Sequence, residues 1–180
     1  MVIWDDLGDD GQVDLEDFNA LPDQELRAVL STCLAVGRWV DEVAAKRPYP
    51  DQAVVLAQAD ASARTLTEQE VAAALALHPR IGERPKTDDE ESRFSRREQS
   101  DVDEADIALA RRLAEGNAAY EARFGRVFLI RAKGRDSGEI LAELDRRLGN
   151  DRRAEVEEVA GQLREIAVLR LEEVLEQWAQ

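Results

Sequence analysis

Apolar residues recur every three or four positions along most of this 180-residue chain, and this spacing constrains the fold more than any other feature. It places apolar side chains on one face of an α-helix, whereas a strand alternates every second residue. Only residues 127–130 form a strand-like run, which is too short to build a sheet alone. We therefore expect an all-α protein, a single-domain irregular bundle of about seven to nine helices. Helical runs are predicted from near Pro22 to 33, around 39–44, and over about 51–63, 67–78, 95–124, 136–148 and 151–178.

Local signals set the expected limits of the domain and of its helices. Residues 1–17 carry seven acidic residues, no basic residue and two glycines, which indicates an acidic leader before a single helical domain over 18–180. Thr67 and Glu70 have the spacing of a capping box, which starts a helix. Pro79 ends that helix near His78, because proline disfavours helical backbone in the residue before it. Residues 82–93 show no periodicity and form the expected main loop.

The charge of the chain narrows its partners. Twenty-four basic residues against 39 acidic residues give a net charge of −15 and a pI of about 4.5. Such a surface repels phosphate backbones and anionic lipids, so we expect neither nucleic-acid nor membrane binding. If the ligand is itself an anion, the protein has to concentrate positive charge locally, so arginines on buried faces become important.

The residue inventory also limits the chemistry. Cys33 is the only cysteine and His78 the only histidine, so we expect no disulfide and no zinc site. The chain has no glycine-rich phosphate loop or dinucleotide fingerprint, and we expect any catalysis to be free of metal and cofactor. No apolar run reaches the length of a membrane span, and the N-terminus lacks the features of a signal peptide. These features predict a cytoplasmic protein.

His78 is the only side chain whose ordinary pKa lies near neutrality. It comes at the predicted end of a helix, where an imidazole often caps carbonyl groups or contacts the negative end of the helix dipole. The functional alternative is a general acid/base held rigidly by Pro79. The sequence leaves both interpretations open.

The segment Ser95-Arg96-Arg97-Glu98-Gln99 allows two interpretations as well. A serine and a glutamate three residues apart form a capping box. On a helix, Ser95, Glu98 and Gln99 also share one face, where a hydroxyl, a carboxylate and an amide converge on one polar ligand.

Arg170 interrupts the apolar stripe of the last predicted helix, which is formed by Val159, Leu163, Ile166 and Val174. A buried, unpaired charge there costs several kcal/mol in folding free energy, because the ion loses its hydration. Arg170 therefore either bonds to a buried carboxylate or reaches into a cavity to bind an anion through its planar guanidinium. A side chain that snorkels to an interface is the third possibility.

Asn117 and Tyr120 lie on a similar apolar stripe in the predicted helix 95–124, before the glycine break at Gly125. A buried asparagine there is expected to tie down backbone groups. Alternatively, it supports an extended segment whose free N–H and C=O groups bind an amide-rich ligand.

Taken together, these motifs resemble the OHCU decarboxylase family, whose substrate is 2-oxo-4-hydroxy-4-carboxy-5-ureidoimidazoline. The resemblance spans roughly residues 15–175. The matching runs are Phe18-Asn19-Ala20-Leu21-Pro22, His78-Pro79-Arg80-Ile81-Gly82, Ser95-x-x-Glu98-Gln99, Asn117-x-x-Tyr120-x-x-x-Phe124-Gly125-x-x-Phe128 and Glu165-Ile166-x-x-x-Arg170-Leu171.

The resemblance implies an all-helical homodimer that releases CO2 from this intermediate of uric acid breakdown to give (S)-allantoin, without metal or cofactor. By position, His78 and Glu98 would be the catalytic residues, with Pro79 orienting the imidazole. Arg170 would hold the carboxylate or ring oxygens. The other substrate-binding positions would be Ser95, Gln99 and the backbone around Phe128, Leu129 and Ile130. The alternative is a non-catalytic helical interaction protein that retains the family scaffold.

Overall fold

The computed structural model describes residues 15–76, 78, 81 and 107–178, and within these it is entirely helical, as predicted. Eight helices make up the described part of the chain, within the expected range of seven to nine. They are α1 (Leu15–Ala20), α2 (Asp23–Cys33), α3 (Gly37–Ala44), α4 (Gln52–Ala63), α5 (Glu68–Leu75), α7 (Ile107–Phe124), α8 (Ser137–Arg147) and α9 (Arg152–Trp178). None of these helices is long and apolar enough to cross a membrane.

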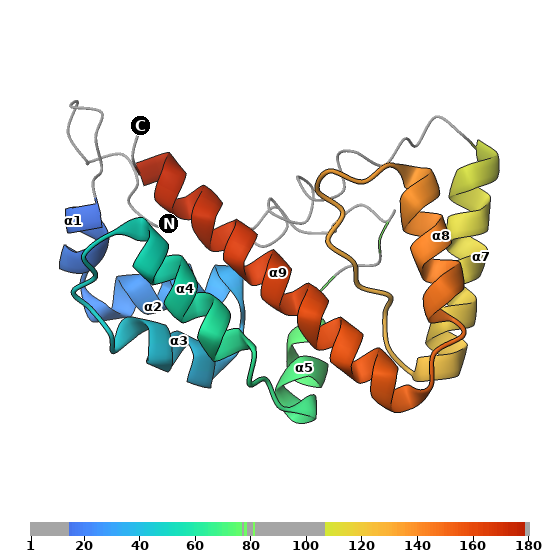
Figure 1. The fold of residues 1–180 in the computed structure, drawn as a ribbon, viewed down its shortest axis with the longest axis horizontal. Coiled ribbons are helices and arrows are strands. Elements are labelled where there is room, and N and C mark those ends of the chain that lie inside the picture. Colours follow the sequence, from blue (N-terminus) through green and yellow to red (C-terminus); the bar gives the residue numbers. More distant parts are fainter. Residues whose placement is uncertain (1–14, 77, 79–80, 82–106, 179–180) are drawn as a thin grey trace.

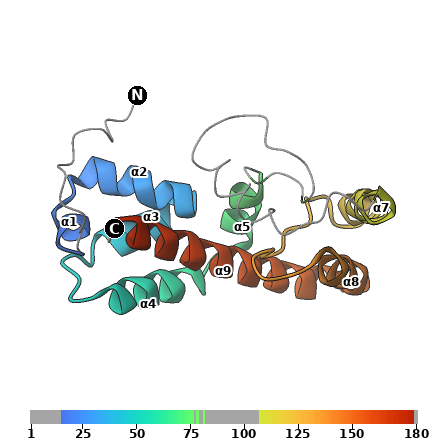
Figure 2. The same ribbon diagram turned by 90° about the horizontal axis from the view of Figure 1, so that it is seen from above.

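The long helix α9 joins the two ends of the molecule (Figure 1). Helices α1 to α4 gather around its C-terminal half, where α9 contacts α2 and α4. The pair α7 and α8 lies at its N-terminal end, and α5 packs against its middle (Figure 2). The buried side chains accordingly form two clusters. The first contains residues of α1 to α5 and α9, and the second contains residues of α7, α8 and the segment between them.

Local chemistry sets several helix boundaries as the sequence predicts. Thr67 and Glu70 form a complete capping box at the start of α5, and Asp136 and Glu139 form another at the start of α8. These side chains satisfy backbone N–H groups that have no partner within the helix. Gly125 ends α7 with a φ of 69°, in the left-handed region that glycine occupies without strain.

Two elements differ from the sequence expectation. Helix α1 begins at Leu15, so residues 15–17 are helical rather than part of the leader. This short helix is fixed by tertiary contacts: Phe18 is fully buried, and the side chain of Asn19 bonds both to the Tyr49 carbonyl and to the Tyr49 N–H. Helix α5 ends at Leu75, slightly earlier than predicted. Residues 1–14 of the predicted leader and the predicted loop 82–93 lie outside the described residues.

Residues 127–132 connect α7 to α8 without forming a strand. Their side chains nevertheless alternate between the two clusters. Val127 and Leu129 pack with the first cluster, whereas Phe128, Ile130 and Ala132 belong to the second. Alternation with a period of two is the mark of extended backbone. The strand-like pattern thus reflects an extended segment that lies between the two clusters.

Candidate functional site

The imidazole of His78 lies just after α5, and its two ring nitrogens have different surroundings. Nδ1 lies 2.9 Å from the Ala74 carbonyl oxygen. Because a carbonyl only accepts hydrogen bonds, Nδ1 carries the proton in this contact. Nε2 is buried and has no hydrogen-bond partner among the described residues. The capping interpretation of His78 therefore holds for one nitrogen, while the other keeps a buried lone pair.

The pKa of His78 is lowered from 6.5 to about 4. Burial of the ring is the main cause, because it penalises the charged form. The positive charge of Arg170 lowers the pKa further, and the hydrogen bond to the Ala74 carbonyl opposes both effects. His78 is therefore neutral at pH 7, and its Nε2 can accept a proton. The electrostatic effect also places Arg170, on α9, near the imidazole.

Arg170 is buried in the apolar stripe of α9, as its spacing predicted, with 1% of its surface exposed. Its neighbours on this stripe include Ile166 and Leu171, which are also buried. The guanidinium Nη1 donates to the Thr32 carbonyl at a distance of 3.4 Å. Thr32 lies in the last turn of α2, where carbonyl groups have no partner within the helix and carry partial negative charge. The end of α2 therefore helps to hold the buried cation.

The extended segment packs in clusters that also contain residues close in sequence to His78 and to Arg170. Leu129 packs in the first cluster together with Ile166 and Ala167, one turn before Arg170 on α9. Ile81, three residues after His78, packs in the second cluster together with Phe128 and Ile130. Residues 128–130 thus share their clusters with Ile81 and with the residues of α9 one turn before Arg170.

Asn117 fixes the segment that follows His78. It is buried on α7, and its Nδ2 donates to the Ile81 carbonyl at 3.1 Å. Its Oδ1 is buried without a partner among the residues that the structure describes. The sequence expectation that Asn117 ties down a backbone group is therefore correct, and the group belongs to the His78–Gly82 motif.

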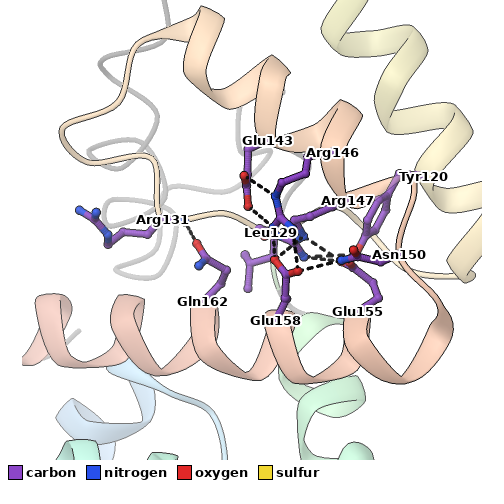
Figure 3. Close-up of polar contacts among 10 residues, drawn as sticks. All are labelled: Tyr120, Leu129, Arg131, Glu143, Arg146, Arg147, Asn150, Glu155, Glu158 and Gln162. Carbon is purple, nitrogen blue, oxygen red and sulfur yellow. Dashed lines mark hydrogen bonds and ion pairs between the residues drawn. The ribbon is translucent and has the colours of Figure 1, made fainter.

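Figure 3 shows a polar network that sequence reasoning missed. Arg147 on α8 is fully buried and forms an ion pair with Glu155 on α9, which is 1% exposed. The Tyr120 hydroxyl donates to the same carboxylate, and Asn150 donates to its other oxygen at 2.8 Å. Burial and the bond to Glu155 raise the pKa of Tyr120.

A signal for this network was present in the sequence. Arg147 continues the stripe of Ile140 and Leu144, and Glu155 precedes Val159 by four residues, so both charges lie on apolar faces. The same reasoning that singled out Arg170 would have found them.

Four predicted site residues, Pro79, Ser95, Glu98 and Gln99, lie outside the described residues. Of the predicted positions that are described, His78 and Arg170 lie close enough for the charge of Arg170 to lower the pKa of the imidazole. Phe128, Leu129 and Ile130 are buried in the extended segment, within the two clusters. Among the described residues, no group of three or more histidine, cysteine or acidic side chains is arranged to hold a metal ion.

Comparison with known proteins agrees with this architecture. Residues 19–172 match the sequence model of a family described as OHCU decarboxylase. The fold is similar to a crystal structure of OHCU decarboxylase in the presence of (S)-allantoin, with a TM-score of 0.68 and 21% identity over 87% of this chain and 99% of that chain. It is also similar to a crystal structure of (S)-allantoin synthase, with a TM-score of 0.63 and 18% identity over 88% of this chain and 53% of that chain. A search of curated proteins gave no match.

Proposed function

Because this chain belongs to the OHCU decarboxylase family, we propose that it converts 2-oxo-4-hydroxy-4-carboxy-5-ureidoimidazoline (OHCU) to (S)-allantoin and CO2. In this proposal His78 is the acid/base and Arg170 binds the anionic substrate. The observation that carries the proposal is a neutral imidazole that lies close to a buried guanidinium and whose buried Nε2 has no partner among the described residues.

The reaction needs a small set of groups. When the bond between the ring carbon and the carboxylate breaks, its electron pair forms a C=C bond to the neighbouring ring carbon. The π electrons of the ring C=N bond move to the nitrogen, which takes up a proton. The hydroxyl proton then has to leave as the carbonyl forms, and the adjacent carbon has to receive a proton on one face. A base, a cation that orients the anion and an apolar wall that disfavours the carboxylate relative to CO2 meet these needs.

His78 suits the role of the base. Its Nδ1 is occupied by the Ala74 carbonyl, so the ring is oriented and the lone pair of Nε2 is available for the hydroxyl proton of the substrate. Its low pKa keeps this lone pair free at neutral pH. A substrate carboxylate bound to Arg170 would offset the positive charge that lowers this pKa, and His78 would then become a stronger base as the substrate binds.

The remaining roles follow from the resemblance. Glu98 is proposed to hold the imidazole or the ureido N–H groups, and Ser95 and Gln99 to bind polar edges of the substrate. Pro79 would orient His78, and the backbone of Phe128, Leu129 and Ile130 would bind the ring amide. The homodimer and the cytoplasmic location stay predictions.

The experiment mixes freshly prepared OHCU with the wild type, with His78→Ala and with the control Arg153→Met, whose side chain is 90% exposed. Optical activity follows the formation of (S)-allantoin. The proposal predicts rapid formation by the wild type and by the control, and a near-complete loss in His78→Ala. If all three proteins leave the uncatalysed rate unchanged, the chain is a non-catalytic protein on the family scaffold.

A further inference from the structure

The peptide groups on the two edges of the extended segment 127–132 differ in their hydrogen bonds to the rest of the protein. In extended backbone, the N–H and C=O of one residue point to one edge, and those of the next residue point to the other edge. The carbonyl of Leu129 and the N–H of Arg131 therefore share an edge. The N–H and C=O of Ile130 lie on the opposite edge.

Both groups on the first edge have a protein partner (Figure 3). The Leu129 carbonyl accepts a hydrogen bond from Nη1 of Arg147 at 2.7 Å. The N–H of Arg131 donates to Oε1 of Gln162 on α9 at 2.8 Å. By contrast, the N–H and C=O of Ile130 make no hydrogen bond to another described residue, although Ile130 is only 3% exposed. Buried peptide groups in folded proteins almost always have partners, so this edge is suited to a ligand.

Arg147, which donates to the Leu129 carbonyl, is itself fixed by several contacts. The guanidinium of Arg147 is fixed by Glu155, and it also lies over the Phe128 ring at 4.7 Å from the ring centroid. A buried ion pair contributes little net stability compared with well-packed apolar side chains, so its value lies in the geometry that it imposes. Here a planar guanidinium contacts a carboxylate, a ring and a carbonyl at once, which a lysine cannot reproduce.

The position of Gln162 places this edge near the proposed reaction centre. Gln162 lies on the same helix as Arg170, eight positions earlier, which corresponds to about 12 Å along the helix axis. That distance is of the order of the length of a small substrate plus one side chain. A displacement of the segment would therefore shift any bound molecule relative to Arg170.

We propose that Arg147 and Gln162 are positioning residues, which hold one edge of the extended segment so that the Ile130 peptide groups on the other edge bind the substrate. The inference rests on the proposed function and deepens it, because it names the two side chains that hold the proposed substrate-binding edge in place. Neither Arg147 nor Gln162 needs to touch the substrate.

The test compares the wild type with Gln162→Met and Arg147→Lys. Methionine keeps the length of Gln162 but removes the acceptor, and lysine keeps the charge that Glu155 needs. Gln58→Met is the matched control, because the Gln58 side chain bonds to Ser62 within α4. Two quantities are measured for each protein: the steady-state constants with OHCU, and the hydrogen exchange of the Ile130 amide with and without (S)-allantoin.

In the wild type and the control, (S)-allantoin is expected to slow the exchange of the Ile130 amide. In Gln162→Met this protection falls and KM rises by about tenfold, while kcat stays within about twofold, which corresponds to the loss of one oriented hydrogen bond. Arg147→Lys shows the same pattern. Because Gln162 is partly exposed, Gln162→Met remains informative if Arg147→Lys does not fold.

Two results overturn the inference: no protection of Ile130 in the wild type, or protection and KM unchanged in folded Gln162→Met. Failure of the proposed function is recognised separately, as absence of turnover by the wild type. A wild type that does not turn over OHCU but shows ligand protection of Ile130, lost in Gln162→Met, would support the positioning role and refute the decarboxylase activity.

Discussion

The positive charge of Arg170 on α9 lowers the pKa of His78, which lies in the turn after α5. The chain thus keeps a neutral base close to a permanent, buried cation in a protein whose net charge is −15. In such a pair the cation attracts an anionic ligand, and the bound anion in turn strengthens the base. The pair concentrates positive charge locally, as the acidic composition requires of a protein that binds an anion.

Arg170→Met should lower activity in a protein that still folds. Methionine fits an apolar stripe, but groups that bond to the guanidinium, such as the Thr32 carbonyl, lose their donor, so we also expect some loss of stability. Loss of the cation should lower kcat/KM for OHCU by about 10²–10³-fold, the range for removal of one charge-stabilising donor. Steady-state kinetics check this, with Arg153→Met as the control on the same helix. A folded Arg170→Met with wild-type kcat/KM would show that the guanidinium does not bind the substrate.

The low pKa of His78 should make stability depend on pH in a defined window. Between pH 6.5 and about 4 the unfolded chain binds a proton at His78 that the folded protein does not. The free energy of unfolding therefore falls as the pH is lowered through this window, by up to about 1.4 kcal/mol per pH unit from this group, and His78 adds no dependence above it.

The measurement is urea unfolding at several pH values for the wild type and for His78→Asn, which does not titrate but keeps a donor for the Ala74 carbonyl. The difference in unfolding free energy between the two proteins should be constant above pH 6.5. Below pH 6.5 the wild type should lose unfolding free energy relative to His78→Asn. Parallel curves down to pH 4 would show that His78 titrates normally.

The sequence predicted elements that depend on local chemistry. The capping residues Thr67 and Glu70 and the break at Gly125 act within a few residues, so the start of α5 and the end of α7 could be placed. The burial of Arg170 followed from the apolar stripe of its own helix. Helix α1 was missed because its six residues are stabilised by distant partners, such as Tyr49 for Asn19.

Contacts between helices were harder to foresee. Nothing in the spacing of residues indicates that α5 packs against α9, so the proximity of His78 and Arg170 was expected only through the family resemblance. The charges of Arg147 and Glu155 lie on apolar stripes and could have been flagged. Their shared role at the Leu129 carbonyl could not, because that contact depends on how α8 packs against the extended segment.

Asn117→Leu should loosen the segment that follows His78. The substitution keeps the branched shape of the side chain, with somewhat larger methyl groups, but leaves the Ile81 carbonyl without its donor, at a cost of about 1–3 kcal/mol in the free energy of unfolding. Because Ile81 lies three residues after His78, we also expect kcat to fall more than KM rises. Chemical unfolding and kinetics test this beside Glu115→Gln, an exposed change on the same helix. An unchanged kcat in a destabilised Asn117→Leu would limit Asn117 to a role in folding.

Gly125→Ala and Gly161→Ala should change stability in opposite directions. A Cβ would have open space at both positions, so only the backbone differs. At Gly125 the φ of 69° makes alanine unfavourable by about 1–2 kcal/mol. Gly161 lies inside α9, where alanine should add about 1 kcal/mol of stability. Thermal and urea unfolding of both variants check the signs. Equal effects would mean that α7 does not end in a left-handed residue.

The most direct test of the His78–Arg170 pair is the NMR titration of the His78 ring. His78 is the only histidine in the sequence, so its ring signals need no assignment in an untagged protein. A pKa of about 4 is expected in the wild type, and a higher pKa in Arg170→Met, because the neighbouring positive charge is gone. A pKa near 6.5 that is the same in both proteins would contradict the account, since the imidazole would then be neither buried nor close to Arg170.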